Sequence, residues 1–317
     1  MTSTRTCDLE GRATAHRFLF TKWGFPIVRC AGCGLISTLA PPDFAGQCPA
    51  LYDEGYFEGG RRDGYCAYGD SEPIVRRQFA QVLRRIRRLV GGGRLLDLGC
   101  AYGFFLKEAA CAFACVGMDV SPHGVAVARS QGLDARCGTI EEGGFADGSF
   151  DVVTLLDTIE HLPSPRATIR EAYRVLAPGG LLAISTGDAG APSPRCHLRS
   201  WRLMTPPQHL YFFSRHTLRR LLESSGFEIR SIVYEWKFVP LGLVGFQFCR
   251  RLGLPGGWAR GLRGGVYVNL FDAVTVLAVK RGGDSPRGGG SLREHVATPR
   301  TGSPGRLGLT DSRVAVA

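Results

Sequence analysis

A glycine-rich turn in the middle of the chain is the segment whose residue types most plainly indicate chemistry. Leu95 to Leu98 is a short apolar run with the length of a strand buried on both faces, and it ends in Gly99-Cys-Ala-Tyr-Gly103. An apolar, helix-compatible segment begins at Phe104. Glycine lets a ligand approach the main chain, and the first amides of a helix point free N–H groups at whatever binds there. The pattern therefore predicts a nucleotide site at this turn.

The spacing of the glycines argues against two common kinds of nucleotide site. A dinucleotide fingerprint reads G-x-G-x-x-G, but Ala101 and Phe104 occupy its third and sixth positions. A phosphate-binding loop reads G-x-x-x-x-G-K-[ST], which is absent from the sequence. Asp119, 20 residues beyond Gly99, ends a second apolar run. A carboxylate at such a strand end can accept hydrogen bonds from ribose hydroxyls, so the two features together indicate a nucleoside site.

The turn and three later segments resemble motifs of class I S-adenosylmethionine-dependent methyltransferases, in particular the methyltransferase-23 and ubiquinone-O-methyltransferase-like group. Arg94–Gly103 is similar to their motif I. Phe145–Asp151, leading into a strand and Asp157-Thr-Ile-Glu-His-Leu162, is similar to their motif IV region. Arg174–Ser185 resembles their helix end, Pro-Gly-Gly turn and fifth strand, and Pro206–Ser214 resembles a later segment of the group.

From residue 94 the chain alternates strands and helices, which predicts a parallel sheet with helices on both faces. The resemblance implies a Rossmann-like α/β fold with seven strands, the last one antiparallel, and S-adenosylmethionine as cofactor. Thr139 stands where many of these enzymes have an aspartate that bonds adenine, so its hydroxyl and the backbone of Ile140 are expected to take that contact. The expected cofactor-binding residues are Asp97, Gly99, Cys100, Ala101, Gly103, Asp119, Thr139, Ile140 and Asp157.

Two histidines are candidate catalytic residues. Methyl transfer from a sulfonium is an in-line displacement, and a base helps greatly when the nucleophile is a hydroxyl such as a phenol, with a pKa near 10. His161 follows Glu160 just after the fourth predicted strand, and His209 lies in residues 186–214, which we expect to be irregular and to cover the acceptor. Either imidazole could take the proton. The alternative for each is a structural role in its turn.

The N-terminal segment has a cysteine pattern typical of zinc binding. Val28-Arg-Cys-Ala-Gly-Cys-Gly-Leu35 is a knuckle of the kind that wraps a tetrahedral zinc ion, and it resembles the second half of a zinc-ribbon-like module that precedes many such methyltransferases. The first half reads Cys7-Asp-Leu-Glu10, so a glutamate replaces its second cysteine. The expected ligands are Cys7, Cys30 and Cys33, with Glu10, His16 or Cys48 as a fourth; a vestigial site is the alternative.

Composition indicates a globular protein of the cytoplasm. The sequence begins without the charged segment and apolar core of a signal peptide, and it has no uncharged apolar run of membrane-spanning length. We therefore expect its eleven cysteines to be reduced. The net charge of +11 comes mainly from arginine, because only four basic residues are lysines. Arginines are densest in residues 73–90, between apolar residues at helical spacing. We interpret this segment as a helix with a solvated face in preference to an anionic-surface site.

The predicted organisation has four parts. They are a zinc-ribbon-like segment (1–50), an aromatic strap and arginine-rich helix (51–93), the methyltransferase domain (94–280) and a disordered tail (281–317). The expected activity is methyl transfer to oxygen or carbon of a small-molecule acceptor, such as a sugar, glycan, lipid-linked intermediate or secondary metabolite.

An RNA methyltransferase and a non-catalytic S-adenosylmethionine-binding module remain as alternatives. Nucleic acid is the less favoured partner, because enzymes acting on exocyclic base amines usually carry [DNS]-P-P-[YF] where this chain has Asp157-Thr-Ile-Glu160. An insertion between the sixth and seventh predicted strands could shape the acceptor pocket or touch a membrane surface, but we favour an ordinary packed helical cover.

Overall fold

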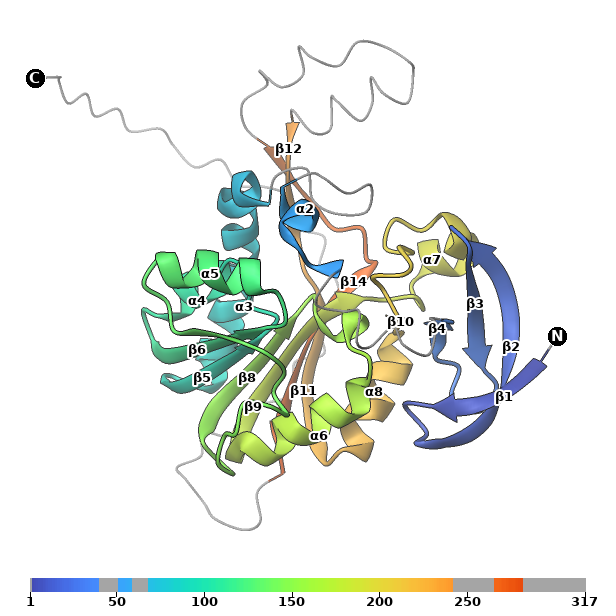
Figure 1. Ribbon diagram of the computed structural model, residues 1–317, viewed down its shortest axis with the longest axis horizontal. Coiled ribbons are helices and arrows are strands. Elements are labelled where there is room, and N and C mark those ends of the chain that lie inside the picture. Colours follow the sequence, from blue (N-terminus) through green and yellow to red (C-terminus); the bar gives the residue numbers. More distant parts are fainter. Residues whose placement is uncertain (1, 40–50, 59–67, 242–264, 282–317) are drawn as a thin grey trace, which may run out of the picture. The chain divides into compact units, whose positions relative to one another are not determined.

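A seven-stranded sheet forms the centre of the computed structural model, which describes residues 2–39, 51–58, 68–241 and 265–281 (Figure 1). Its strand order is β11-β14-β9-β8-β5-β6-β7. Every pair from β9 to β7 is parallel, whereas β14 is antiparallel to both neighbours, as predicted for the last strand. The strands are β5 (Gly93–Leu98), β6 (Phe113–Asp119), β7 (Ala135–Cys137), β8 (Phe150–Leu156), β9 (Leu176–Gly187), β11 (Phe227–Tyr234) and β14 (Ala273–Lys280).

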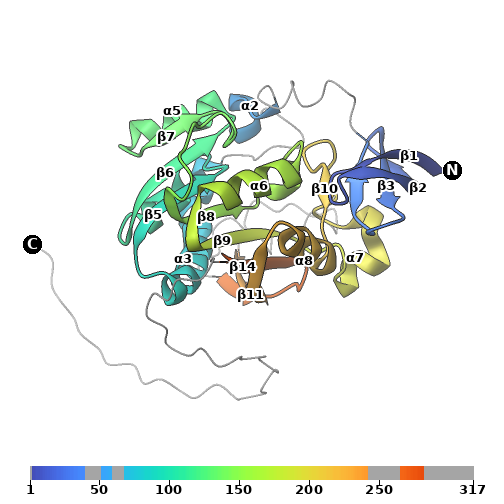
Figure 2. The same ribbon diagram turned by 90° about the horizontal axis from the view of Figure 1, so that it is seen from below.

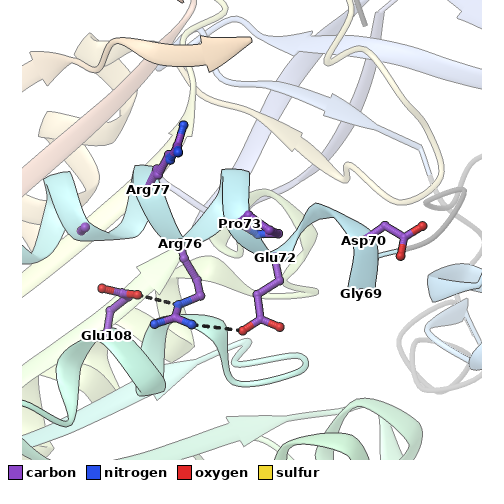
Figure 3. Close-up of a pocket in the computed structure, with 8 residues that line it drawn as sticks. Gly69, Asp70, Glu72, Pro73, Arg76, Arg77 and Glu108 are labelled. Carbon is purple, nitrogen blue, oxygen red and sulfur yellow. Dashed lines mark hydrogen bonds and ion pairs between the residues drawn. The ribbon is translucent and has the colours of Figure 1, made fainter. Parts of the chain in front are cut away.

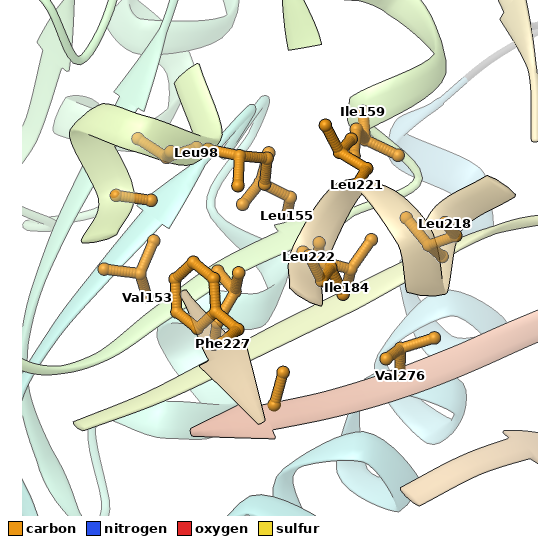
Figure 4. Packing of buried hydrophobic residues seen from close by; sticks show 14 of the residues in the cluster. Leu98, Val153, Leu155, Ile159, Ile184, Leu218, Leu221, Leu222, Phe227 and Val276 are labelled. Atoms are coloured by element: carbon orange, nitrogen blue, oxygen red, sulfur yellow. The ribbon is translucent and has the colours of Figure 1, made fainter. Parts of the chain in front are cut away.

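Helices cover both faces of this sheet because successive strand residues point to opposite sides. On one face, which α6 (Pro165–Val175) and α8 (Arg215–Ser224) cover (Figure 2), Leu98 and its neighbours form a cluster with apolar residues of these helices (Figure 4). Leu95 and its neighbours on the opposite face of the sheet pack against α3 (Glu72–Leu89) and α4 (Phe104–Ala109). A further helix, α5 (Pro122–Ser130), begins at Ser121, whose side chain accepts a hydrogen bond from the Gly124 N–H as the predicted N-cap.

A second, antiparallel sheet contains the N-terminal segment. Its order is β1-β2-β3-β4-β10, so a strand from the methyltransferase region completes it. In β10, Tyr211 pairs with Ser37 and Phe212 with Ile36. The N-terminal segment is therefore bonded to the loop expected to cover the acceptor. The strands are β1 (Thr2–Cys7), β2 (Arg12–Lys22), β3 (Phe25–Cys30), β4 (Ile36–Thr38) and β10 (Tyr211–Phe212).

Residues 186–214, which we expected to be irregular, contain short helices. Residues 186–214 include α7 (Pro192–His197), the 3-10 helix η3 (Leu198–Ser200) and β10, so the expectation for this segment was wrong. We expected the prolines of this segment to prevent regular structure. In the first turn of a helix, however, proline is tolerated, because the N–H that it lacks would have no partner within the helix. The aromatic strap likewise contains α2 (Glu54–Phe57), capped by Asp53.

A two-stranded ribbon precedes the last strand. It pairs β12 (Lys237–Pro240) with β13 (Gly265–Val268) and belongs to the predicted insertion. No helix among the described residues is long and apolar enough to cross a bilayer. Cys48 and the predicted disordered tail lie outside the described residues, and the four-part organisation stays a prediction.

Candidate active site

The glycine turn after β5, residues 99–103, is tied to β6 by its own amides, and we call it the donor loop because it is expected to bind S-adenosylmethionine. The N–H groups of Gly99 and Cys100 both donate to the Met118 carbonyl (2.7 and 3.0 Å). The Ala101 N–H donates to Asp119 Oδ2 (2.8 Å). The glycine pattern predicts amides aimed at a ligand, but these three amides instead hold the loop against β6. These bonds fix the loop to the end of β6.

Gly99 lies where the donor loop meets the loop after β8. Its φ is +79°, and a Cβ at this position would lie 2.4 Å from Thr158 Oγ1. The Thr158 hydroxyl donates to the Leu98 carbonyl (3.0 Å), so this contact is part of a bond that joins the two loops. Only glycine satisfies both the backbone angle and the available space.

Gly99→Ala should weaken S-adenosylmethionine binding at least tenfold and lower the free energy of unfolding by about 2 kcal/mol. The added methyl group meets Thr158, and a positive φ strains any other residue. Gly132→Ala is the matched control, because Gly132 also has a φ of +79° but no atom within 4 Å of its added Cβ. Calorimetric titration and thermal unfolding measure both effects. Equal donor affinity in the two variants would contradict a donor-binding role for the loop.

A buried carboxyl group, Asp97, and a half-buried one, Asp119, lie behind the donor loop. Asp119 accepts the Ala101 and Ser121 N–H groups, one on each oxygen (both 2.8 Å), and burial raises its pKa. Asp97 accepts the Thr154 hydroxyl (2.6 Å), and burial raises its pKa to about 7. A cation bound nearby would favour the ionised form of both groups, and S-adenosylmethionine is cationic.

Of the two residues expected to contact adenine, Thr139 is already hydrogen-bonded to Glu142 and Ile140 is buried. The Thr139 N–H and hydroxyl both donate to Glu142 Oε2 (2.9 and 3.1 Å), which lowers the pKa of Glu142. Ile140 is buried beside Met118 in the main core. An adenine contact at Thr139 therefore requires its hydroxyl to accept a hydrogen bond or to leave Glu142.

Asp157 adopts an uncommon backbone conformation at the end of β8. Its φ is +53°, and strained residues of this kind cluster at functional sites. The Ser185 hydroxyl donates to Asp157 Oδ1 (3.0 Å), and the Asp157 N–H donates to the Ser185 carbonyl (3.0 Å). These bonds hold the carboxyl ends of β8 and β9 together.

His161 and His209 lie together beyond the carboxyl end of β8. His161 ends the 3-10 helix η2 (Ile159–His161), and His209 comes just before β10. Their ring centroids are 4.6 Å apart, edge to face. The carboxylate of Glu160, which accepts the Thr186 hydroxyl (2.9 Å), completes a group whose ligand-type atoms all lie within 4.8 Å of one another. Two imidazoles and a carboxylate suit proton transfer, and they also suit a divalent cation.

Hydrogen bonds at Nδ1 determine which ring nitrogen carries the proton. His209 Nδ1 lies 2.7 Å from the Leu203 carbonyl, and His161 Nδ1 lies 3.1 Å from the Gln208 carbonyl. A carbonyl only accepts, so both Nδ1 atoms carry hydrogen. Burial lowers the pKa of His209 to about 4 and that of His161 well below its ordinary value. Both rings are therefore neutral at pH 7 and present a lone pair at Nε2.

Tyr52 of the aromatic strap connects the two histidines to the residues around the donor loop. Its hydroxyl lies 3.0 Å from His161 Nδ1, and its backbone carbonyl accepts the Ser121 hydroxyl (2.5 Å). Farther along the strap, Phe57 stacks on Tyr102 of the donor loop with ring centroids 4.9 Å apart. The strap thus spans from the donor loop to the histidines.

Three buried cysteines converge at the end of the N-terminal sheet. The sulfur atoms of Cys7, Cys30 and Cys33 lie within 4.8 Å of one another, with Cys7 and Cys33 3.5 Å apart. Glu10, at the fourth position of the pattern, lies with Oε1 2.8 Å from Arg220 Nη2 on α8. The three thiols fit zinc, while the carboxylate in the fourth place is ion-paired with the methyltransferase region.

The alternative fourth ligand His16 is buried and has its Nδ1 3.0 Å from the Thr14 carbonyl. Its ring nitrogens are not among the described ligand atoms that lie within 4.8 Å of one another at this site, which are the sulfur atoms of the three cysteines. Glu10 is not part of that group either, so the described residues place no fourth ligand with the three sulfur atoms.

A hollow of about 630 Å³ beside α3 contains none of the predicted site residues (Figure 3). Its lining is charged: Arg76 contacts Glu108 (2.5 Å) and Glu72 (3.4 Å). Lys107 also pairs with Glu72 (2.7 Å). These ion pairs anchor α3 to α4 and account for the polar character of the hollow.

The strand order, the glycine turn after β5 and the carboxylate ending β6 define a class I S-adenosylmethionine-dependent methyltransferase fold. The chain belongs to the methyltransferase-domain family Methyltransf_23, which matches residues 74–232. A chain in the complex between the Haloferax volcanii Trm112 methyltransferase activator and a methyltransferase has a similar fold. The TM-score is 0.50 at 18% identity, covering 67% of this chain and 94% of that one.

Two relatives by sequence are ubiquinone biosynthesis O-methyltransferases. The protein from Hahella chejuensis is 32% identical over 174 residues, which cover 48% of this chain and 73% of the relative. The protein from Xanthomonas oryzae pv. oryzae is 40% identical over 105 residues, which cover 31% of this chain and 44% of the relative. The chain thus matches less than half the length of the Xanthomonas protein.

Proposed function

We propose that this protein transfers a methyl group from S-adenosylmethionine to a hydroxyl oxygen of a small phenolic acceptor. The observation that carries the proposal is the pair of neutral histidines, His161 and His209, which lie in contact beyond the carboxyl end of β8 with Nδ1 of each engaged by a carbonyl group. The names of the sequence relatives, which specify O-methyl transfer in ubiquinone biosynthesis, support the choice of oxygen.

In this proposal the donor is held along the carboxyl edge of β5, β6 and β8. Asp119 binds the ribose hydroxyls, the loop before Gly103 faces the methionine part, and Thr139 with Ile140 borders adenine. The full set is Asp97, Gly99, Cys100, Ala101, Gly103, Asp119, Thr139, Ile140 and Asp157. Its support is the convergence of these segments at the edge where such sheets bind ligands.

When bound, S-adenosylmethionine supplies an electrophilic methyl group. The chain's own residues orient the acceptor oxygen in line with that group, and Nε2 of His161 or His209 accepts the acceptor's proton. Tyr52 and the Gln208 carbonyl hold the ring of His161 through Nδ1, and the Leu203 carbonyl holds His209. These bonds keep each lone pair in a constant direction.

A screen with labelled methyl donor tests the proposal. Catechols and other phenols, sugar nucleotides and RNA are offered separately to the full chain. We expect label on the phenols, located on oxygen by mass spectrometry. Label confined to RNA would support the alternative RNA methyltransferase, and donor binding without transfer to any class would support a non-catalytic binding module.

We also propose that Cys7, Cys30 and Cys33 bind one zinc ion that holds the end of the N-terminal sheet together. The three buried sulfur atoms support this, and the ion would contribute to folding rather than to catalysis.

Cys30→Ser should lower bound zinc from about one ion per chain to less than half of that, because a hydroxyl is a far weaker zinc ligand than a thiolate. Elemental analysis of the purified protein gives the content. Cys111→Ser is the control, because Cys111 is exposed and lies outside the cluster. A wild-type protein without zinc would show that the site is vestigial.

A further inference from the structure

Exposed apolar side chains gather around the β12–β13 ribbon. Eight large apolar side chains are exposed in the described part of the chain, and six of them lie between residues 236 and 271. Their exposed fractions run from 37% to 57%. So many exposed apolar groups in one region mark an interaction site more often than chance. This set, here called the apolar face, consists of Trp236, Leu241, Val266, Tyr267, Leu270 and Phe271.

The apolar face lies at the edge of the sheet that carries the candidate active site. Ala273, the first residue of β14, pairs with Gly187 at the carboxyl end of β9, so the preceding ribbon leaves the sheet there. The same end of β9 holds Asp157 through Ser185. Figure 1 shows β12 and α2 of the strap at this one end of the sheet.

A row of exposed arginines borders the apolar face. Arg77, Arg84 and Arg88 are exposed on α3, and their spacing places them on one stripe of the helix together with Gln81. Gln81 donates to the Trp236 carbonyl (3.0 Å), which fixes this stripe beside the apolar face. The adjacent acidic residue Glu235 pairs with Arg85 (2.6 Å). The border of the apolar face is therefore basic.

We propose that the apolar face and the arginine stripe dock this protein on the surface of an anionic lipid bilayer. Aromatic and aliphatic side chains enter the boundary between headgroups and acyl chains, while arginines beside them contact acidic headgroups. The net charge of +11 adds a long-range attraction to such a surface. Docked in this way, the protein turns the edge that bears the active site toward the membrane. If the proposed function holds as well, a phenolic acceptor with an apolar tail can enter from the bilayer.

Vesicle sedimentation with the full chain tests the proposal. Vesicles of phosphatidylcholine mixed equally with phosphatidylglycerol are compared with vesicles of phosphatidylcholine alone. We expect at least tenfold tighter binding to the anionic vesicles. Arg84→Gln should weaken that binding about fivefold, the contribution of one arginine at an anionic surface. Trp236→Ser should weaken it about tenfold by removing an aromatic anchor.

Matched substitutions on the N-terminal sheet are the controls. Trp23 is 54% exposed, as is Trp236, and Arg17 is exposed like Arg84. Trp23→Ser and Arg17→Gln should leave vesicle binding within twofold of wild type. Donor affinity, measured on the same samples, confirms that each variant is folded.

Absence of vesicle binding, or equal losses in the test and control variants, would overturn the proposal. Sedimentation velocity without lipid tests for dimers. A wild-type dimer that becomes a monomer in Trp236→Ser would overturn the proposal and assign the apolar face to a second copy of the chain. Vesicle binding is measured without any acceptor, so its outcome is independent of whether the proposed methyl transfer is correct.

Discussion

Asp119→Ala is expected to lower the affinity for S-adenosylmethionine at least 100-fold. The Asp119 carboxylate accepts one backbone N–H on each oxygen (both 2.8 Å), which leaves a second lone pair on each for the ribose hydroxyls. Hydrogen bonds to a charged group contribute about 1.5–3 kcal/mol each. Two such bonds therefore account for two decades or more in the dissociation constant. Calorimetric titration measures the change directly.

The control must separate ribose binding from the anchoring of the donor loop. Asp151 Oδ2 accepts the Arg94 N–H (2.8 Å) at the opposite end of β5, so Asp151→Ala also removes a carboxylate that anchors a backbone amide. We expect this control to lower thermal stability while donor affinity stays within threefold of wild type. Similar losses of donor affinity in both variants would show that Asp119 acts only through the backbone, and unchanged affinity in Asp119→Ala would end the donor-site assignment.

Replacing the histidine that takes the acceptor proton should lower kcat by about 10²- to 10⁴-fold. His161→Ala and His209→Ala are compared, and we expect the large loss in one and a loss of less than tenfold in the other. Only one Nε2 can receive the proton, while the second ring packs against the first with centroids 4.6 Å apart. Donor affinity should be unchanged in both variants, because neither ring belongs to the donor loop.

The pH dependence follows from the depressed pKa values of these histidines. His209, with a pKa of about 4, is neutral above that pH and becomes charged as the pH falls through it. Its capacity to accept a proton is therefore present at pH 6 to 8 and lost only in acid. A kcat that falls in acid with an apparent pKa near 6.5, the ordinary value of histidine, would contradict the assignment of the base to this neutral pair.

Two outcomes would remove the base from the proposed mechanism. Losses of less than tenfold in both histidine variants would mean that neither ring takes the proton. Loss of wild-type activity on treatment with a chelator, restored by a divalent cation, would assign Glu160, His161 and His209 to a metal site.

Local sequence patterns predicted most of the sheet because their causes lie within a few residues. The run Leu95–Leu98 is a strand because its side chains are buried on both faces, and Ser121 with Pro122 begins a helix by capping. The same reasoning misread residues 186–214, where prolines begin α7 instead of breaking regular structure. A proline has opposite effects in the first turn of a helix and in its interior, so composition alone does not distinguish them.

The amino-acid order by itself predicted the strands of the main sheet and the residue types along one of its edges, but not α7 or β10. Folding of the whole chain decided which of those residues meet. Tyr52 contacts His161 although the two are 109 residues apart in the sequence, and His209 contacts the His161 ring from a different loop. The protonation of the two imidazoles also depends on carbonyl groups and burial supplied by distant segments. Caps and strand patterns act between neighbours in the chain, whereas pKa values and contacts between loops depend on neighbours in space.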